Sequence, residues 1–80
     1  MKKMETLGEL SERILSEYQD KEILLKVNGK VLMYFSNSHE FYVHLNVNLA
    51  KLKVEKIVNR SFGVVIQLNF VSVINTFNLL

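Results

Sequence analysis

The dipeptide Asn28-Gly29 restricts the fold of this chain more than any other short sequence in it. It lies between two apolar runs, and a two-residue type I′ turn requires positive φ at both central positions, which Asn and Gly tolerate best. We therefore predict a β-hairpin whose strands cover about residues 22–27 and 30–36.

The short loop also predicts which side chains of the hairpin share a face. A two-residue turn places Val27 opposite Lys30 and Leu25 opposite Leu32, and residues directly opposite each other point to the same side of a sheet. The face expected to lie in the core then contains Ile23, Leu25, Val27, Leu32 and Tyr34.

Residues 40–48, EFYVHLNVN, alternate between apolar residues and residues that can form hydrogen bonds. This period of two is typical of a strand with one buried face, so we predict a third strand that extends the hairpin into a meander. Phe41, Val43 and Leu45 would join the core. The other, less buried face would bring together the residues that we predict to bind a partner: Met33, Phe35, Tyr42, His44 and Asn46.

An amphipathic helix is predicted at about residues 6–19. Thr6 and Glu9 have the spacing of a capping box, in which each side chain accepts a hydrogen bond from the backbone of the other residue. An apolar stripe at helical spacing would pack on the sheet, and it consists of Leu7, Leu10, Ile14 and Tyr18.

The rest of the chain predicts strands at about residues 50–58 and 62–70, although a short helix also suits the apolar spacing of the first segment. After Phe70 the apolar phase changes, which fits either a further strand at 71–75 or a C-terminal helix. Residues 1–80 are therefore expected to form a single α+β domain. Its N-terminal helix would pack on a curved antiparallel sheet of about five strands, as a meander or a small open barrel.

A chain of 80 residues is close to the lower limit for a self-sufficient core. It has no cysteine, so neither a disulfide framework nor a thiolate zinc site can add stability. Self-association is the common alternative, and we expect a homo-oligomer, either a dimer or a ring.

Two observations bear on location. Acidic residues interrupt the N-terminus before an apolar run develops, which argues against a signal peptide and, with the lack of cysteine, favours the cytoplasm. Residues 62–80 carry no charge and are long enough to span a bilayer, but their amide and hydroxyl side chains favour a buried or paired strand and no membrane contact.

Charge is distributed unevenly along the chain. Residues 1–22 contain four basic and six acidic residues, whereas residues 23–80 contain six basic and two acidic residues. Most of the later basic residues lie in one run, KLKVEKIVNR. A solvent-exposed face is the simpler interpretation of this run, but it could also contact phosphate or an acidic protein surface. Its members are Lys51, Lys53, Lys56 and Arg60.

No catalytic arrangement is apparent. In an extended segment His39 and His44 would point to opposite faces, and Glu40 would lie roughly 13 Å from His44. The sequence contains no phosphate-binding loop, nucleophile elbow or metal-ligand spacing. We therefore predict that the chain is not an enzyme and uses no cofactor or metal.

The N-terminal helix, the Asn28-Gly29 hairpin and the closing segment FVSVIN resemble the Sm-like small barrels that bind RNA, and the strand pattern also matches SH3-like barrels. The resemblance implies a barrel architecture. Leu68-Asn69 replaces the residues with which Sm-like proteins hold RNA, so the resemblance concerns the fold more than the activity.

Two functions follow as hypotheses. The first is a self-associating protein-binding module that acts as a regulator or inhibitor by covering a partner surface, as small phage or mobile-element proteins do against host or defence proteins. The second is an RNA-binding or single-stranded nucleic-acid-binding protein, in which Phe35, Tyr42 and His44 stack on bases and the basic run neutralises phosphates.

Overall fold

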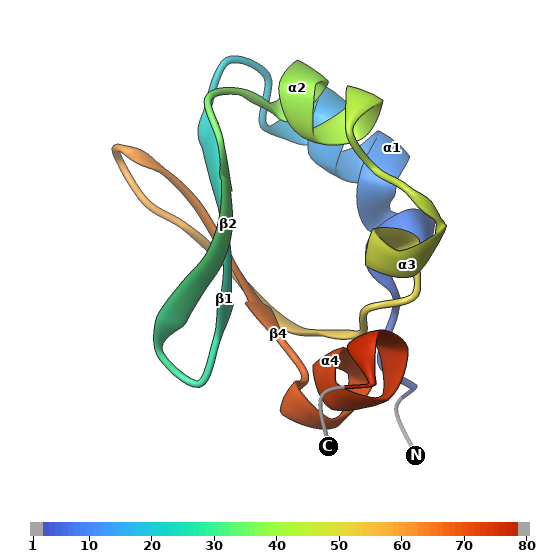
Figure 1. The fold of residues 1–80 in the computed structure, drawn as a ribbon. Coiled ribbons are helices and arrows are strands. Elements are labelled where there is room, and N and C mark those ends of the chain that lie inside the picture. The colour runs from blue at the N-terminus through green and yellow to red at the C-terminus, as the bar shows by residue number, and fades with distance from the viewer. Residues whose placement is uncertain (1–2, 79–80) are drawn as a thin grey trace.

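The computed structural model describes residues 3–78, which form one four-stranded sheet with helices on one side (Figure 1). The strand order is β2-β1-β4-β3; the two central strands are parallel, and each outer strand is antiparallel to its neighbour. In chain order the elements are α1 (Leu7–Glu17), β1 (Glu22–Val27), β2 (Lys30–Phe35), α2 (Ser38–Val43), α3 (Val47–Ala50), β3 (Val54–Asn59), β4 (Gly63–Leu68) and α4 (Phe70–Phe77).

The predicted N-terminal helix and its capping box are confirmed. The Thr6 backbone N–H donates to the Glu9 carboxylate at 2.8 Å, and the Glu9 backbone N–H donates to the Thr6 hydroxyl at 3.1 Å. The hydrogen bond from the Thr6 backbone N–H stabilises the charged carboxylate and is the main reason that the pKa of Glu9 is lowered. The buried face of α1 carries Leu7, Leu10 and Ile14, as expected from the helical spacing.

The hairpin is also confirmed, but half of its predicted register is wrong. Asn28 and Gly29 have φ of 51° and 79°, and Val27 lies opposite Lys30. Further along, a β-bulge leaves Leu32 as an extra residue in β2, so Leu25 pairs with Met33. Side chains alternate between the two faces of a strand, so the extra residue changes which side chains of β2 face the core beyond the bulge. Tyr34 and Phe35 therefore point to the opposite faces from those predicted.

The predicted strand at 40–48 is wrong, because this segment forms the two short helices α2 and α3. Asn37 and Asn46 cap them, each accepting a backbone N–H at 2.8 Å, and such side-chain hydrogen bonds favour a helix start over a strand. Phe41 is buried in the core, but Val43 is 61% exposed where a strand would have buried it.

The second half of the chain contains two strands and a final helix. The first expected strand starts later than predicted, because α3 extends to Ala50. After β4 the chain forms α4, which confirms the helical alternative for residues 71–75. The sheet thus has four strands and is mixed, and the predicted five-stranded antiparallel, barrel-like outline is not confirmed.

The core lies between the sheet and the layer formed by α1, α2 and α3 (Figure 1). The sheet side chains that face these helices are fully buried, and they include Ile23, Leu25, Val64 and Ile66. Helix α4 lies beyond the end of β4. None of the helices within residues 3–78 is both long and apolar enough to cross a membrane.

Candidate functional site

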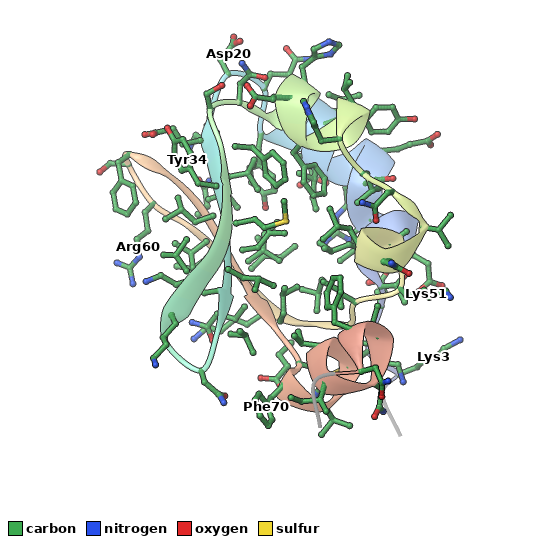
Figure 2. All side chains as sticks on the ribbon, viewed as in Figure 1. Lys3, Asp20, Tyr34, Lys51, Arg60 and Phe70 are labelled. Atoms are coloured by element: carbon green, nitrogen blue, oxygen red, sulfur yellow. The ribbon has the colours of Figure 1, made fainter. Side chains whose placement is uncertain are left out.

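The sheet has an open face, which we define as the side turned away from α1, α2 and α3. Strand pairing aligns one residue from each of the four strands on this side, because Leu24 pairs with both Tyr34 and Val65, and Val65 also pairs with Val58. We call these four residues the apolar row. In Figure 2 Tyr34 and Arg60 extend from the side of the sheet opposite the helices.

A second row of the open face is polar and positively charged. Lys26 pairs with both Val31 and Gln67, and Gln67 also pairs with Lys56. Directly opposite residues share a face, so both lysines lie on the open side next to the apolar row. The open face therefore consists of an apolar band with cations beside it.

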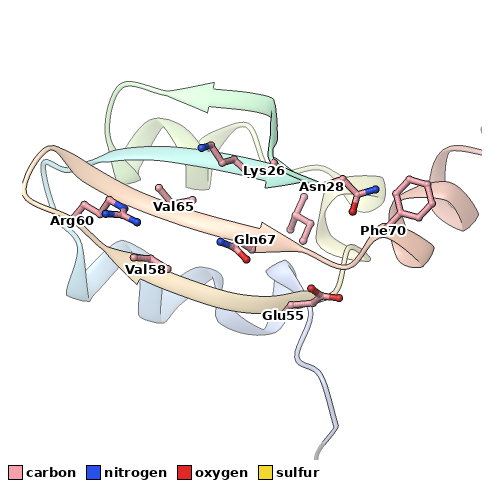
Figure 3. Close-up of a pocket in the computed structure, with 10 residues that line it drawn as sticks. Lys26, Asn28, Glu55, Val58, Arg60, Val65, Gln67 and Phe70 are labelled. Atoms are coloured by element: carbon pink, nitrogen blue, oxygen red, sulfur yellow. The ribbon is translucent and has the colours of Figure 1, made fainter.

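The open face contains a hollow of about 290 Å³ over β1, β3 and β4 (Figure 3). Val58 and Val65 form part of its apolar lining, and Figure 3 shows the helices behind the sheet, on the far side from the hollow. The remaining lining residues are Lys26, Asn28, Gly29, Glu55, Arg60, Gln67, Leu68 and Phe70.

The acidic side chains near the open face already have hydrogen-bond donors. The Tyr34 hydroxyl donates to Glu22, and this carboxylate raises the pKa of Tyr34 because it favours the neutral phenol. The Asn69 amide donates to Glu55 at 3.0 Å. By contrast, no carboxylate within residues 3–78 forms a salt bridge with Lys26, Lys56 or Arg60.

The residues predicted to bind a partner do not form one surface. Phe35 lies in the core, where its ring meets Phe41 edge-on at a centroid distance of 5.5 Å, and Met33 packs against the same core. Tyr42, His44 and Asn46 are exposed on the helical layer, across the core from the open face. The His44 ring remains close to the Phe35 ring, with a centroid distance of 6.4 Å. However, Phe35 is buried while His44 is exposed, so the predicted residues do not share one exposed surface.

The basic run is divided between two surfaces. Lys56 lies on the open face, and Arg60 lines its hollow. Lys51 and Lys53 instead line a separate, smaller depression together with residues of α4, including Val71 and Asn75. The run is continuous in sequence but not in space, because α3 ends and β3 begins within it.

Sequence reasoning missed most of the open face. It assigned Tyr34 to the core, and it did not place Val58 or Val65 on an open face of the sheet, where Val65 is itself only 6% exposed. The alternation of residues 22–27 contains the signal for Leu24 and Lys26, but only the parallel pairing of β1 with β4 places them beside Val65 and Gln67.

Within residues 3–78, no group of three His, Asp or Glu side chains is positioned to hold a metal ion. Comparison with protein-family models, with curated proteins and with solved structures gave no match to this chain. A functional assignment must therefore come from the open face itself.

Proposed function

We propose that this chain is a non-enzymatic protein-binding module that docks a partner protein on its open face. The observation that carries the proposal is the apolar row, which crosses all four strands on the side that no helix of residues 3–78 covers. Tyr34 is 53% exposed at the end of this row. A contiguous apolar band with a polar rim is typical of a protein interaction site.

The composition of the open face favours a protein over a nucleic acid. Proteins that bind single-stranded RNA on a sheet stack bases on aromatic side chains. Here the two central strands contribute Leu24 and Val65 to the apolar row, and the aromatic Tyr34 lies on an outer strand. Lys51 and Lys53 lie away from this face, which leaves fewer cations for a phosphate backbone.

The mode of action we propose is occlusion. A domain with an apolar sheet face can act by covering a surface of its partner, as a regulator or an inhibitor. Self-association remains a proposal as well, because a second copy of the chain could cover the same face.

A comparison of two tyrosine variants tests the docking surface. Tyr34 and Tyr42 are both exposed, at 53% and 39%, but Tyr34 lies on the open face and Tyr42 on the helical layer. A pull-down from host lysate, quantified by mass spectrometry, should lose the specific partner with Tyr34→Ala and keep it with Tyr42→Ala. Loss with Tyr42→Ala alone would move the docking surface to the helices and refute the proposal.

A further inference from the structure

We infer that the partner presents an acidic side chain next to an apolar one, and that Lys26 and Arg60 hold its carboxylate above the hollow. This inference rests on the proposed function, because it names the chemistry of the protein that docks on the open face. It depends on three features: the placement of the two cations, the charges around them and the lining of the hollow.

Lys26 and Arg60 reach the hollow from opposite ends of β4. Lys26 pairs with Gln67 on β4, while Arg60 exchanges backbone hydrogen bonds with Gly63 of 2.8 and 3.2 Å. Val65 lies between Gly63 and Gln67 on the same strand. In Figure 3 the side chains of Lys26 and Arg60 both extend toward Val65, so their charged ends flank an apolar floor.

No carboxylate within residues 3–78 forms a salt bridge with either cation. Glu22 and Glu55, the acids nearest to this face, accept hydrogen bonds from Tyr34 and Asn69. Lys26 and Arg60 line the same hollow. An incoming carboxylate would accept charge-assisted hydrogen bonds from both groups.

The hollow explains why the acidic residue should have an apolar neighbour. Its volume of about 290 Å³ provides room beside the cations, and Val58 and Val65 are part of its lining. Phe70 lines the same hollow and is 47% exposed. An apolar side chain of the partner would bury this surface while the adjacent carboxylate contacts Lys26 and Arg60.

A polyanion fits the hollow less well than a single carboxylate does. Glu55 is part of its lining and repels a second negative charge placed near it. Among residues 3–78, Phe70 is the one aromatic residue in the lining, and Val58 and Val65 offer no second aromatic surface for base stacking. The favoured occupant is therefore an acidic protein segment and not RNA.

A selection from random dodecapeptides displayed on phage tests the inference on the full chain. We expect the wild type to enrich peptides with Asp or Glu next to an apolar residue. The double variant Lys26→Glu/Arg60→Glu should bind these peptides at least about tenfold more weakly. The control Lys51→Glu/Lys53→Glu makes the same change in net charge on the other surface and should bind them like the wild type. Amide NMR spectra establish that each variant is folded.

Different failures lead to different conclusions. Enrichment of apolar peptides without acidic residues, or equal binding by the two double variants, would overturn the inference and leave the proposed function intact. If the wild type enriches peptides no more strongly than Tyr34→Ala does, both the inference and the proposed function would be overturned. If a short oligouridine perturbs the amides of Lys26, Val58 and Gln67 more than the selected peptides do, the occupant is nucleic acid. Sedimentation that reveals a dimer lost with Tyr34→Ala would assign the face to a second copy.

Discussion

Leu25 lies opposite Met33 in the β1–β2 ladder, although a two-residue hairpin loop without a bulge would place it opposite Leu32. The single extra residue changes which face of β2 is buried. Phe35 is 4% exposed and lies in the core, whereas Tyr34 is 53% exposed and lies on the open face. The surface that we propose to bind a partner therefore depends on one β-bulge.

This register predicts different effects for two neighbouring aromatic residues. Phe35→Ala removes a buried ring that contacts Phe41, so we expect it to lower the free energy of unfolding by about 3–5 kcal/mol. Tyr34→Ala should lower the free energy of unfolding much less, because this ring is 53% exposed and loses mainly its hydrogen bond to Glu22. Urea denaturation followed by circular dichroism measures both. A larger loss for Tyr34→Ala would mean that the bulge is absent.

The helical assignment of residues 38–43 predicts a capping effect at Asn37. Its side chain accepts a hydrogen bond from the Glu40 backbone N–H, so Asn37→Ala should lower the free energy of unfolding by about 1 kcal/mol. Asn37→Ser should retain most of this stability, because serine also caps helices well. Asn48→Ala is the matched control, since Asn48 is exposed within α3. If Asn37→Ala is as neutral as this control in the same denaturation experiment, residues 38–43 do not form a capped helix.

Gly63 permits the close approach of the two central strands. A Cβ atom at this position would lie 2.8 Å from the Glu22 carbonyl oxygen, so Gly63→Ala must displace backbone atoms where β1 meets β4. We expect a loss of about 1–3 kcal/mol and NMR shifts along β1. Gly29→Asn provides the contrast, because Asn tolerates positive φ and nothing lies within 4 Å of a Cβ there. Comparable losses for both variants would argue against the parallel pairing of β1 and β4.

The hydrogen bond from Tyr34 to Glu22 predicts a pH effect. The raised pKa of Tyr34 means that folding favours the neutral phenol, so this contribution to stability is present below the ordinary tyrosine pKa of 10.0 and is lost as the pH rises through the raised value. Glu22→Gln should lower the pKa of Tyr34 toward that ordinary value. Tyrosine ring NMR signals followed against pH measure this, and an unchanged titration in Glu22→Gln would exclude the hydrogen bond.

Local signals in the sequence predicted several elements because the responsible interactions lie within a few residues of each other. The capping box of Thr6 and Glu9 and the turn at Asn28-Gly29 belong to this group. The segment at 40–48 misled the prediction because Phe41 and Leu45 fit both a period of two and the i, i+4 spacing of a helix. The Asn residues at 37 and 46 carried the helical signal, as N-caps.

By itself, the sequence determined a small α+β domain with an amphipathic N-terminal helix and an early hairpin, since short-range hydrogen bonds and side-chain periodicity set these elements. Only the tertiary structure decided which sheet face remains open, because this depends on the bulge at Leu32 and on the parallel pairing of β1 with β4, which joins distant segments. Those contacts place Lys26 and Arg60 on either side of Val65, although they lie far apart along the chain. Long-range strand pairing, which leaves no short sequence signal, is the physical reason for the difference.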